Sequence, residues 1–286
     1  MKITPRTLAI FMSAAALETK RVESEQHLAH LRAAGVIGQK RPITIRASPP
    51  TEGAVLKPNQ KIVHLQRHAQ GFHNLMGDLY RELGKSFDST GMDTTGSPYV
   101  LPELLDPPLT AVGREQCKAA RPVAVSKSPQ VVICSPMCRC LQTALLTFDH
   151  LVDTPSAVPF VAVEDARETF GAHTCDARRA VSEIKKEFGH RVDFSEMTTE
   201  EDTLSFDTTG SLRPRETVRE EVERVYRLLL YLRARKETEL AVVSHSSYLF
   251  TMLNAVIDLG DHADSGLWFD TCEIRTLLLT YEDNDA

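Results

Sequence analysis

The sequence lacks the features that mark membrane-spanning and nucleic-acid-binding proteins. None of its segments is both long enough and apolar enough to cross a bilayer. Basic residues are not in excess either, since 33 lysines and arginines face 39 aspartates and glutamates, for a formal net charge of -6. This mild acidic excess gives no general attraction for nucleic acid or for an anionic membrane. An anionic small molecule would therefore need a local pocket of positive charge.

The sequence also lacks a cysteine pattern that indicates a disulfide framework or a structural zinc site. Its six cysteines include the closely spaced Cys134, Cys138 and Cys140. Structural zinc sites usually combine such a group with a second Cys/His pair, and none is evident here. An even number of cysteines in a chain of 286 residues does not by itself indicate disulfides. We therefore expect no metal site, and reduced thiols in a cytoplasmic protein.

The first sixty residues are interpreted as a helix followed by a proline-rich linker. An apolar run from Leu8 to Leu17 follows two basic residues, which is the general shape of a secretory signal. Charged residues follow at once, however, and the run merges into a helix-like stretch from Met12 to Ala34. A soluble N-terminal helix is the favoured interpretation, and a targeting peptide is the alternative. Gln39 to Gln60 contains four prolines and predicts a linker, which places the folded domain at residues 61–286.

Short apolar strands alternate with helices along the rest of the chain. The segment Arg215 to Lys236, with valines and leucines on one face, is the clearest helix. Thr110 is expected to cap a helix from Ala111 to Ala120, and Ser135 with Pro136 to open a helix from Met137 to His150. A further helix is expected from Ser246 to Ile257, and strands at Lys61–Gln66, Val131–Cys134, Phe160–Val163, Leu240–Ser244 and Ile274–Thr280. This order predicts an α/β fold, a three-layer α/β/α sandwich with a mostly parallel central sheet.

Reactive polar residues follow four of the predicted strands. Arg67 and His68 follow the first, Ser135 and Arg139 the second, Glu168 the third, and His245 the fourth. The carboxyl ends of parallel strands lie at one edge of a sheet, which is where sites form in α/β folds. Four separate segments are therefore expected to bring their polar side chains together.

A phosphate monoester suits these side chains. Arg67 and Arg139 provide two guanidinium groups, which bind phosphate oxygens in a forked geometry. His68 is expected to attack phosphorus as a neutral imidazole, because neighbouring cations lower the pKa of a histidine. A charged His245 is expected to stabilise the phosphoryl oxygens.

The leaving alcohol needs a general acid, and a carboxyl group after the third strand is the natural candidate. Glu168 is favoured, and its neighbours Glu164 and Asp165 are alternatives. The same carboxyl group would then take a proton from the water that attacks in the next step. One such proton transfer accelerates a reaction by roughly a hundred- to ten-thousand-fold.

The candidate residues lie within five short motifs in a fixed order. Residues 67–74 read RHAQGFHN, residues 106–113 read DPPLTAVG, and residues 135–144 read SPMCRCLQTA. Residues 167–179 read RETFGAHTCDARR and residues 243–246 read VSHS. Together they resemble, over about Lys61 to Thr280, the signatures of the histidine phosphatase (phosphoglycerate mutase-like) superfamily. The form RHAQGxHN resembles its fungal and plant branch.

The resemblance implies the family's fold and a mechanism without a metal or an organic cofactor. It implies a phosphohistidine on His68, a proton donor at Glu168, and a phosphate pocket formed by Arg67, Arg139 and His245. Asn74, in the first motif, is expected to contact the phosphate or to position its loop. Three positions depart from the usual pattern without removing a charged catalytic group: Ala69, Pro107 and Ser246.

Three functions are compatible with such a site. The first is hydrolysis of a small phosphate monoester, and the second is a phosphomutase, which returns the phosphoryl group to another hydroxyl. A catalytically idle phospholigand-binding module is the third, and the retained reactive residues disfavour it. The expected partner is a small phosphorylated molecule, with no nucleic acid and no membrane, and the oligomeric state is open. The identity of the phosphorylated substrate should depend on two long inserts, Leu75 to Pro108 and Ala172 to Pro214.

Overall fold

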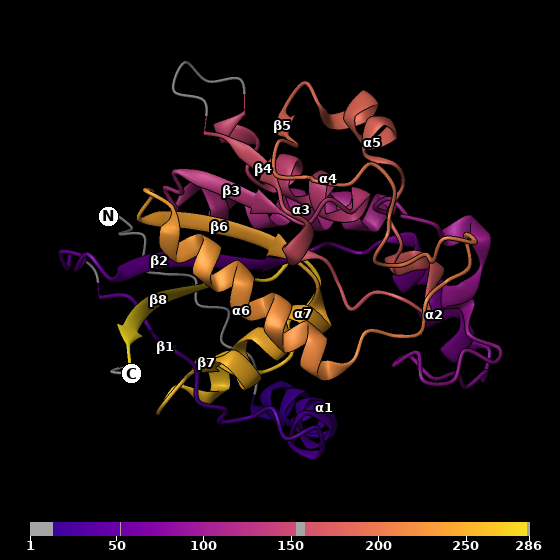
Figure 1. The fold of residues 1–286 in the computed structure, drawn as a ribbon, viewed down its shortest axis with the longest axis horizontal. Helices are drawn as coiled ribbons and strands as arrows, with labels where there is room; N and C mark the ends of the chain where they lie inside the picture. Colours follow the sequence, from indigo (N-terminus) through magenta and orange to yellow (C-terminus); the bar gives the residue numbers. More distant parts are fainter. Residues whose placement is uncertain (1–13, 52, 153–157, 285–286) are drawn as a thin grey trace, which may run out of the picture.

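The central element of the computed structural model is one sheet of eight strands, and the structure describes residues 14–51, 53–152 and 158–284 (Figure 1). The strands are β1 (Ile43–Ser48), β2 (Gln60–Arg67), β3 (Val131–Cys134), β4 (Phe160–Ala162), β5 (Val192–Asp193), β6 (Glu239–Ser244), β7 (Ile257–Asp258) and β8 (Ile274–Asp283). Their order across the sheet is β5-β4-β3-β6-β2-β8-β1-β7. Neighbouring strands from β5 to β2 are parallel, and β8 is antiparallel to both β2 and β1. The predicted mostly parallel α/β sheet is confirmed.

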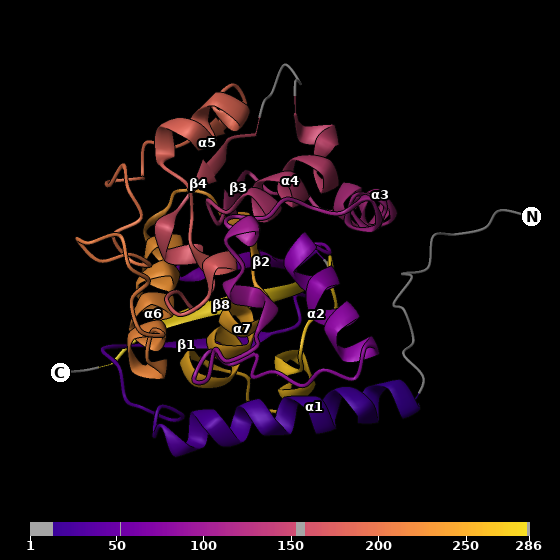
Figure 2. The same cartoon turned by 90° about the vertical axis from the view of Figure 1, so that its right-hand side faces the viewer.

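Helices cover both faces of this sheet. They are α1 (Ala14–Ala33), α2 (Phe72–Glu82), α3 (Ala111–Val125), α4 (Cys138–Thr147), α5 (Val181–Phe188), α6 (Val218–Ala234) and α7 (Ser246–Thr251). In β3, Val131 and Ile133 belong to a buried cluster with α6 and α7. Val132 and Cys134, which point the other way, belong to a second cluster with α4 and α5. This alternation produces the predicted three layers, which are visible in Figures 1 and 2.

Two of the predicted helices begin at side-chain caps, and one of these caps, Thr110, is predicted from the sequence. The Thr110 hydroxyl accepts a hydrogen bond from the amide of Gly113 at the start of α3. Thr217 caps α6, and Glu220 completes a capping box by bonding back to the Thr217 amide. The buried apolar face of α6 includes Val225 and Leu229, as the helical spacing predicts. Helix α6 is thereby fixed at both its first turn and its packed face.

The predicted linker contains a strand. β1 pairs antiparallel with β8 and parallel with β7, and its residues Ile45 and Ala47 are buried. The prediction of a linker over Gln39 to Gln60 is therefore wrong for Ile43–Ser48. Three apolar residues in alternation are too few to stand out between prolines, and the pairing with β8 comes from a segment far away in the sequence. The sheet therefore contains a strand that precedes residue 61, the predicted start of the folded domain.

The N-terminal helix packs on the body of the protein. Leu31 of α1 and Val36 lie in a buried cluster with Val222 of α6 and Phe250 of α7. Figure 2 shows α1 running along one side of the molecule. The start of the apolar run at Leu8, which raised the alternative of a targeting peptide, lies outside the described residues. Of the helices that the structure describes, none has the length and apolar character needed to cross a membrane.

The two long inserts contain structure that periodicity did not predict. Helix α2 occupies the start of the first insert, and α5 and β5 lie in the second. The predicted helix Ser246 to Ile257 is divided into α7, a π-helical turn at Met252–Val256, and β7.

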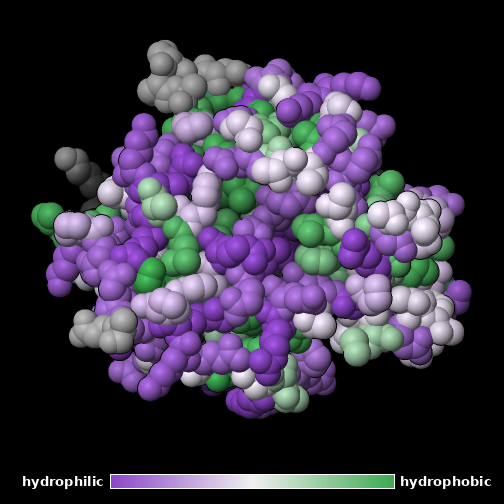
Figure 3. All heavy atoms as spheres, in the orientation of Figure 1, coloured by the Kyte–Doolittle hydropathy of each residue, from purple (hydrophilic) through white to green (hydrophobic). Residues whose placement is uncertain are grey.

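The face seen in Figure 3 is mostly hydrophilic, and its apolar side chains are scattered in small groups.

Candidate active site

The carboxyl ends of β2, β3, β4 and β6 bring the predicted reactive residues together. Arg67, the last residue of β2, is paired in register with Ser244 of β6, so the residues that follow them are neighbours. These are His68 and His245, whose ring centroids lie 5.1 Å apart. The ring of His73, at the start of α2, lies 5.3 Å from that of His68. Three histidines from three segments thus meet at one point.

His68 is held in one orientation and one protonation state. Its side chain is buried, and Nδ1 donates a hydrogen bond to the carbonyl oxygen of Ala69, 2.7 Å away. Burial, together with the charges of Arg139 and Arg67 and the nearby His73, lowers the pKa of His68 well below its usual range. The ring is therefore neutral, with its lone pair on Nε2. Among the described residues, no hydrogen bond to Nε2 is found, so this atom is available as a nucleophile.

His245 is also neutral. Burial, followed by the charge of Arg139, lowers the pKa of His245 well below its usual range. The charged form that the sequence analysis expects for His245 concerns the state with phosphate bound, and it stays a prediction. The Nε2 atom of His245 lies 2.8 Å from the Ser135 hydroxyl, which fixes the ring beside His68. A bound phosphate dianion would favour protonation of this ring.

Ser135 does not cap the helix that follows it. Helix α4 begins at Cys138, whose amide donates to the Asp106 carboxylate at 2.7 Å. The predicted cap at Ser135 is wrong because a carboxylate from a distant loop takes its place, which leaves the Ser135 hydroxyl free to bind His245. The Ser135 hydroxyl therefore makes its polar contact within the site, and the Asp106 carboxylate binds the first amide of the helix.

Arg67 and Arg139 are oriented by backbone carbonyl groups. The Nη1 atom of Arg67 donates to the carbonyl oxygen of Phe269 at 2.7 Å, and Nη1 of Arg139 donates to that of Cys175 at 2.7 Å. Nη2 of Arg139 also binds Oδ1 of Asp176 at 3.1 Å. In both arginines the buried Nε atom has no partner among the described residues. A buried donor without an acceptor is costly, so both side chains suit a ligand rich in acceptor oxygens.

Glu168 lies at the amino end of α7, half-buried. Its carboxylate accepts hydrogen bonds from the amides of Thr169, Tyr248 and Ser247, at 3.0, 3.1 and 3.3 Å. Burial and the nearby charge of Asp176 nevertheless raise the pKa of Glu168, against the opposing effect of Arg215. A carboxyl group with a raised pKa is suited to donate a proton near neutral pH.

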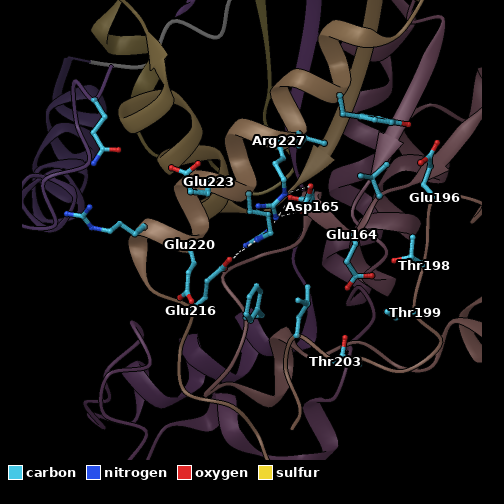
Figure 4. Close-up of a pocket in the computed structure, with 18 residues that line it drawn as sticks. Glu164, Asp165, Glu196, Thr198, Thr199, Thr203, Glu216, Glu220, Glu223 and Arg227 are labelled. Carbon is cyan, nitrogen blue, oxygen red and sulfur yellow. Dashed lines mark hydrogen bonds and ion pairs between the residues drawn. The ribbon is translucent and has the colours of Figure 1, made fainter. Parts of the chain in front are cut away.

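The alternative acids point elsewhere. Glu164 binds Arg167 and Arg178, and Asp165 binds Arg227. Both acids line a cleft of about 720 Å³ beside α6, whose lining includes none of the residues predicted to act on phosphate. Figure 4 shows this cleft, with Arg227 directed toward Asp165. Of the three acids, only Glu168 is near the histidines and arginines of the site.

Asn74 supports the loop that carries His68. Its Oδ1 atom accepts a hydrogen bond from the Gly71 amide at 2.9 Å, at the start of α2. Gly71 is required there, since a Cβ atom on it would lie 2.8 Å from Nδ1 of His73. The side-chain amide of Asn74 retains its two N–H donors, so contact between Asn74 and a phosphate stays a prediction.

Several residues of the site were not predicted from the sequence. Arg215 was assigned to the start of a helix, and Asp176 was noted only within a motif. In the structure they form an ion pair of 2.8 Å next to Arg139. Arg178, a further residue of that motif, is buried and binds Glu164 and backbone carbonyls. The available signal in the sequence is the group of charged residues within one motif, but the partners of these residues come from other segments.

One group of side chains has the composition of a metal site. The ligand atoms of His173, Cys175 and Asp176 lie within 4.8 Å of one another. Both carboxylate oxygens of Asp176 are bound by arginines, however, and burial raises the pKa of the Cys175 thiol well above its usual range. A protonated thiol and two guanidinium groups disfavour a cation. The surroundings therefore fit an anion better than a metal ion.

A family model and several known proteins match this chain. A family model described as "Histidine phosphatase superfamily (branch 1)" matches residues 100–285. A "Phosphoglycerate mutase-like protein" of Arabidopsis thaliana is 31% identical over 254 residues, which cover 78% of this chain and 86% of the relative. A "Probable phosphoglycerate mutase" of Arthroderma benhamiae is 34% identical over 135 residues, which cover 44% and 39%. The solved structure of an ecdysone phosphate phosphatase from Bombix mori is 17% identical, covers 76% of this chain and 88% of its own, and has a TM-score of 0.47.

Proposed function

Because the chain belongs to the histidine phosphatase superfamily, we propose that it hydrolyses a small phosphate monoester through a phosphohistidine on His68. The observation that carries the proposal is the free Nε2 lone pair of His68, fixed by the bond from Nδ1 to Ala69. This nucleophile lies beside His245, with Arg139 close enough to lower the pKa of both rings. The arrangement fits a tetrahedral dianion rather than a metal ion or an extended ligand.

The proposed reaction has two steps. Arg67 and Arg139 bind the phosphoryl oxygens, Nε2 of His68 attacks phosphorus, and the bond from phosphorus to the ester oxygen breaks. Glu168 gives its proton to the departing alkoxide. In the second step the Glu168 carboxylate takes a proton from water, which attacks phosphorus and breaks the bond to Nε2. His68 and the proton on Glu168 are then restored, and inorganic phosphate leaves.

A phosphomutase is the second candidate, and the names of the similar plant and fungal proteins favour it. It would share the first step and would return the phosphoryl group to a hydroxyl of the substrate instead of to water. What separates the two is how well water is excluded during the lifetime of the phosphohistidine. An idle binding module would bind phosphate without forming that intermediate.

The test combines turnover and labelling. The protein is incubated with an aryl phosphate, with and without a chelator, and with a phosphate donor labelled on phosphorus. We expect chelator-insensitive turnover and an acid-labile label, both lost in His68→Gln and retained in His190→Gln, whose histidine is exposed. Absence of turnover and label across acidic to neutral pH would overturn the proposal. A stable label that a phosphoglycerate discharges would identify a mutase.

A further inference from the structure

Asp176 is the point at which two cationic side chains of the site meet. Its Oδ1 atom accepts a hydrogen bond from Nη2 of Arg139 at 3.1 Å, and Oδ2 accepts one from Nη1 of Arg215 at 2.8 Å. Nδ1 of His173 lies 3.4 Å from Oδ2. Asp176 is 5% exposed, so these contacts are shielded from water. Buried charge-assisted hydrogen bonds are stronger than exposed ones, and this carboxylate makes at least two.

The carboxylate of Asp176 is held rigidly as well as charged. Its own backbone oxygen accepts a hydrogen bond from Nη2 of Arg167 at 2.7 Å, and Arg167 is paired with the buried Asp202. Burial opposes ionisation, but Arg215, His173 and Arg139 hold the pKa of Asp176 well below its usual range. Asp176 is therefore a fixed negative charge at all ordinary pH values.

The fixed charge determines where the two arginines point. Arg139 is bound at Nη1 by the Cys175 carbonyl and at Nη2 by Asp176, adjacent residues that together hold both ends of its fork. Arg215 is bound at one nitrogen only, since its Nη1 atom donates both to the Gly171 carbonyl and to Asp176. The Nε atoms of both arginines are buried and have no partner among the described residues. Without Asp176, either guanidinium could rotate away from the site.

The same charge acts on Glu168. Ionised Asp176 disfavours a second negative charge on Glu168, and the buried Glu221 of α6 adds a weaker effect of the same sign. The cations that act on Glu168 in the opposite direction are Arg215, Arg139 of α4 and Arg67 of β2. The thiols of Cys140 and Cys175 also interact with Glu168, and burial keeps both protonated. Asp176 is the strongest of the charged neighbours that keep the proton on Glu168.

We propose that Asp176 is a positioning residue that orients Arg139 and Arg215 around the phosphate and keeps Glu168 in its acid form. The inference rests on the proposed function for its catalytic meaning. One carboxylate then links phosphate binding to proton donation, since the arginine that it orients and the acid that it influences act on opposite sides of the same ester bond. A residue with a merely structural role would affect neither phosphate binding nor proton donation specifically.

The first test does not depend on turnover. The titration of Glu168 is followed in the free protein by carbon-13 NMR of glutamate side-chain carboxyl groups, with the resonance assigned by its loss in Glu168→Gln. In Asp176→Asn, which keeps the shape and loses the charge, we expect Glu168 to titrate at lower pH. In Arg215→Gln we expect it to titrate at higher pH, because an opposing cation is removed. Asp207→Asn, which removes an exposed carboxylate of the same insert, is the control and should leave the titration of Glu168 unchanged.

The opposite directions of the two shifts decide the outcome. An unchanged titration in Asp176→Asn, or equal shifts in all three variants, would overturn the proposal. If Asp176→Asn does not fold, Arg215→Gln alone decides, and an unchanged or lower titration contradicts the proposed balance. Wild-type protein without turnover would contradict the phosphatase proposal while the NMR shifts still test Asp176.

The second test uses turnover. Loss of two charge-assisted hydrogen bonds should lower kcat/KM of Asp176→Asn by roughly tenfold to a hundredfold. The loss should be larger for an alkyl phosphate than for an aryl phosphate, because only the alkyl leaving group depends on the proton from Glu168. The alkaline limb of the pH profile should move to lower pH. Equal losses for both substrates with an unmoved limb would reduce Asp176 to a structural role and overturn the proposal.

Discussion

Nδ1 of His68 donates a hydrogen bond to the backbone carbonyl of Ala69, the next residue in the chain. A carbonyl oxygen can only accept, so Nδ1 carries the proton and the neutral ring keeps its lone pair on Nε2. This contact selects the tautomer, and burial beside Arg139 selects the charge. The reactive state of the histidine is thus established before any substrate binds, and the same burial has consequences for stability.

Acidification should destabilise the protein through its buried histidines. Burial, followed by the charge of Arg139, lowers the pKa of His73 well below its usual range. The unfolded chain therefore binds more protons than the folded protein once the pH falls below about 6.5, so the stabilisation present above that pH is lost as the pH falls toward the folded-state value. Each such histidine contributes at most about 1.4 kcal/mol per pH unit to the fall in unfolding free energy.

Urea unfolding at a series of pH values from about 5 to about 7.5 measures this dependence. We expect a shallower fall in unfolding free energy in His73→Gln than in the wild type, because one of the buried rings no longer titrates. His190→Gln, with an exposed histidine, should match the wild type. An identical slope in His73→Gln and wild type would show that His73 titrates normally.

Removal of the Ser135 hydroxyl should affect catalysis more than folding. Ser135→Ala deletes the 2.8 Å contact to Nε2 of His245 and leaves that atom with the weaker contact to Sγ of Cys140 at 3.4 Å. We expect the unfolding free energy to fall by about 1 kcal/mol and kcat/KM to fall by roughly threefold to thirtyfold. Ser126→Ala, at the exposed end of α3, should change neither quantity. Lower stability with unchanged kcat/KM would instead suit the helix cap that the sequence predicts.

The N-terminal helix should influence phosphate binding through Arg67. Lys20 of α1 binds Asp270 at 2.7 Å and Glu273 at 3.1 Å, on the loop whose Phe269 carbonyl holds Arg67. In Lys20→Met this loop loses its anchor, and we expect KM for a phosphate ester to rise by roughly threefold to tenfold with a smaller change in kcat.

The matched control for Lys20 is Arg21→Met, which removes an exposed ion pair with Asp264 on the same helix. Exposed pairs contribute little, so this variant should keep the wild-type KM. Steady-state kinetics of both variants with an aryl phosphate give the comparison. Equal KM values in Lys20→Met and wild type would show that α1 does not influence phosphate binding.

The buried Glu221 should make the protein less stable at alkaline pH. Burial raises the pKa of Glu221 to about 7, although Thr169 and Thr251 donate hydrogen bonds to its carboxylate. The folded protein thus binds an extra proton between the unfolded value of about 4.5 and 7, and the stability that this provides is lost as the pH rises through 7.

Glu221→Gln removes this titration. We compare the unfolding free energy of the variant with that of the wild type at each pH. The difference between them should grow in favour of the variant by about 3 kcal/mol from about pH 5 to about pH 8. Thermal unfolding across this range measures the change, with the exposed Glu115→Gln as the control. A constant difference between Glu221→Gln and wild type at all pH values would rule out the raised pKa.

The parts of the fold that follow from local pattern could be predicted from the sequence. The apolar run Val131–Cys134 forms β3 with the same bounds, and Thr110 caps α3, because strand burial and capping depend on adjacent residues. The short strand Ile43–Ser48 could not be predicted, since its stability comes from pairing with β8, more than 200 residues away.

The candidate site shows the same division. The positions of Arg67, His68 and His245 follow from the rule that parallel strands end at one edge, and the structure brings these residues together. The contacts of Asp176 with Arg215 and Arg139 could not be predicted, because they join an insert to helix α4 and to the loop before α6. The neutral state of His245 also depends on complete burial, which a motif does not encode.

β1 has a consequence for solubility. It covers one side of β8, with Ile43 to Ser48 opposite Asp283 to Leu278. A shortened chain beginning at Gln60 would leave this ten-residue strand with a row of bare amides and carbonyls, and such an edge recruits strands from other molecules. The segment that precedes the motifs of the candidate site therefore protects the sheet edge from aggregation, in addition to any contribution it makes through α1.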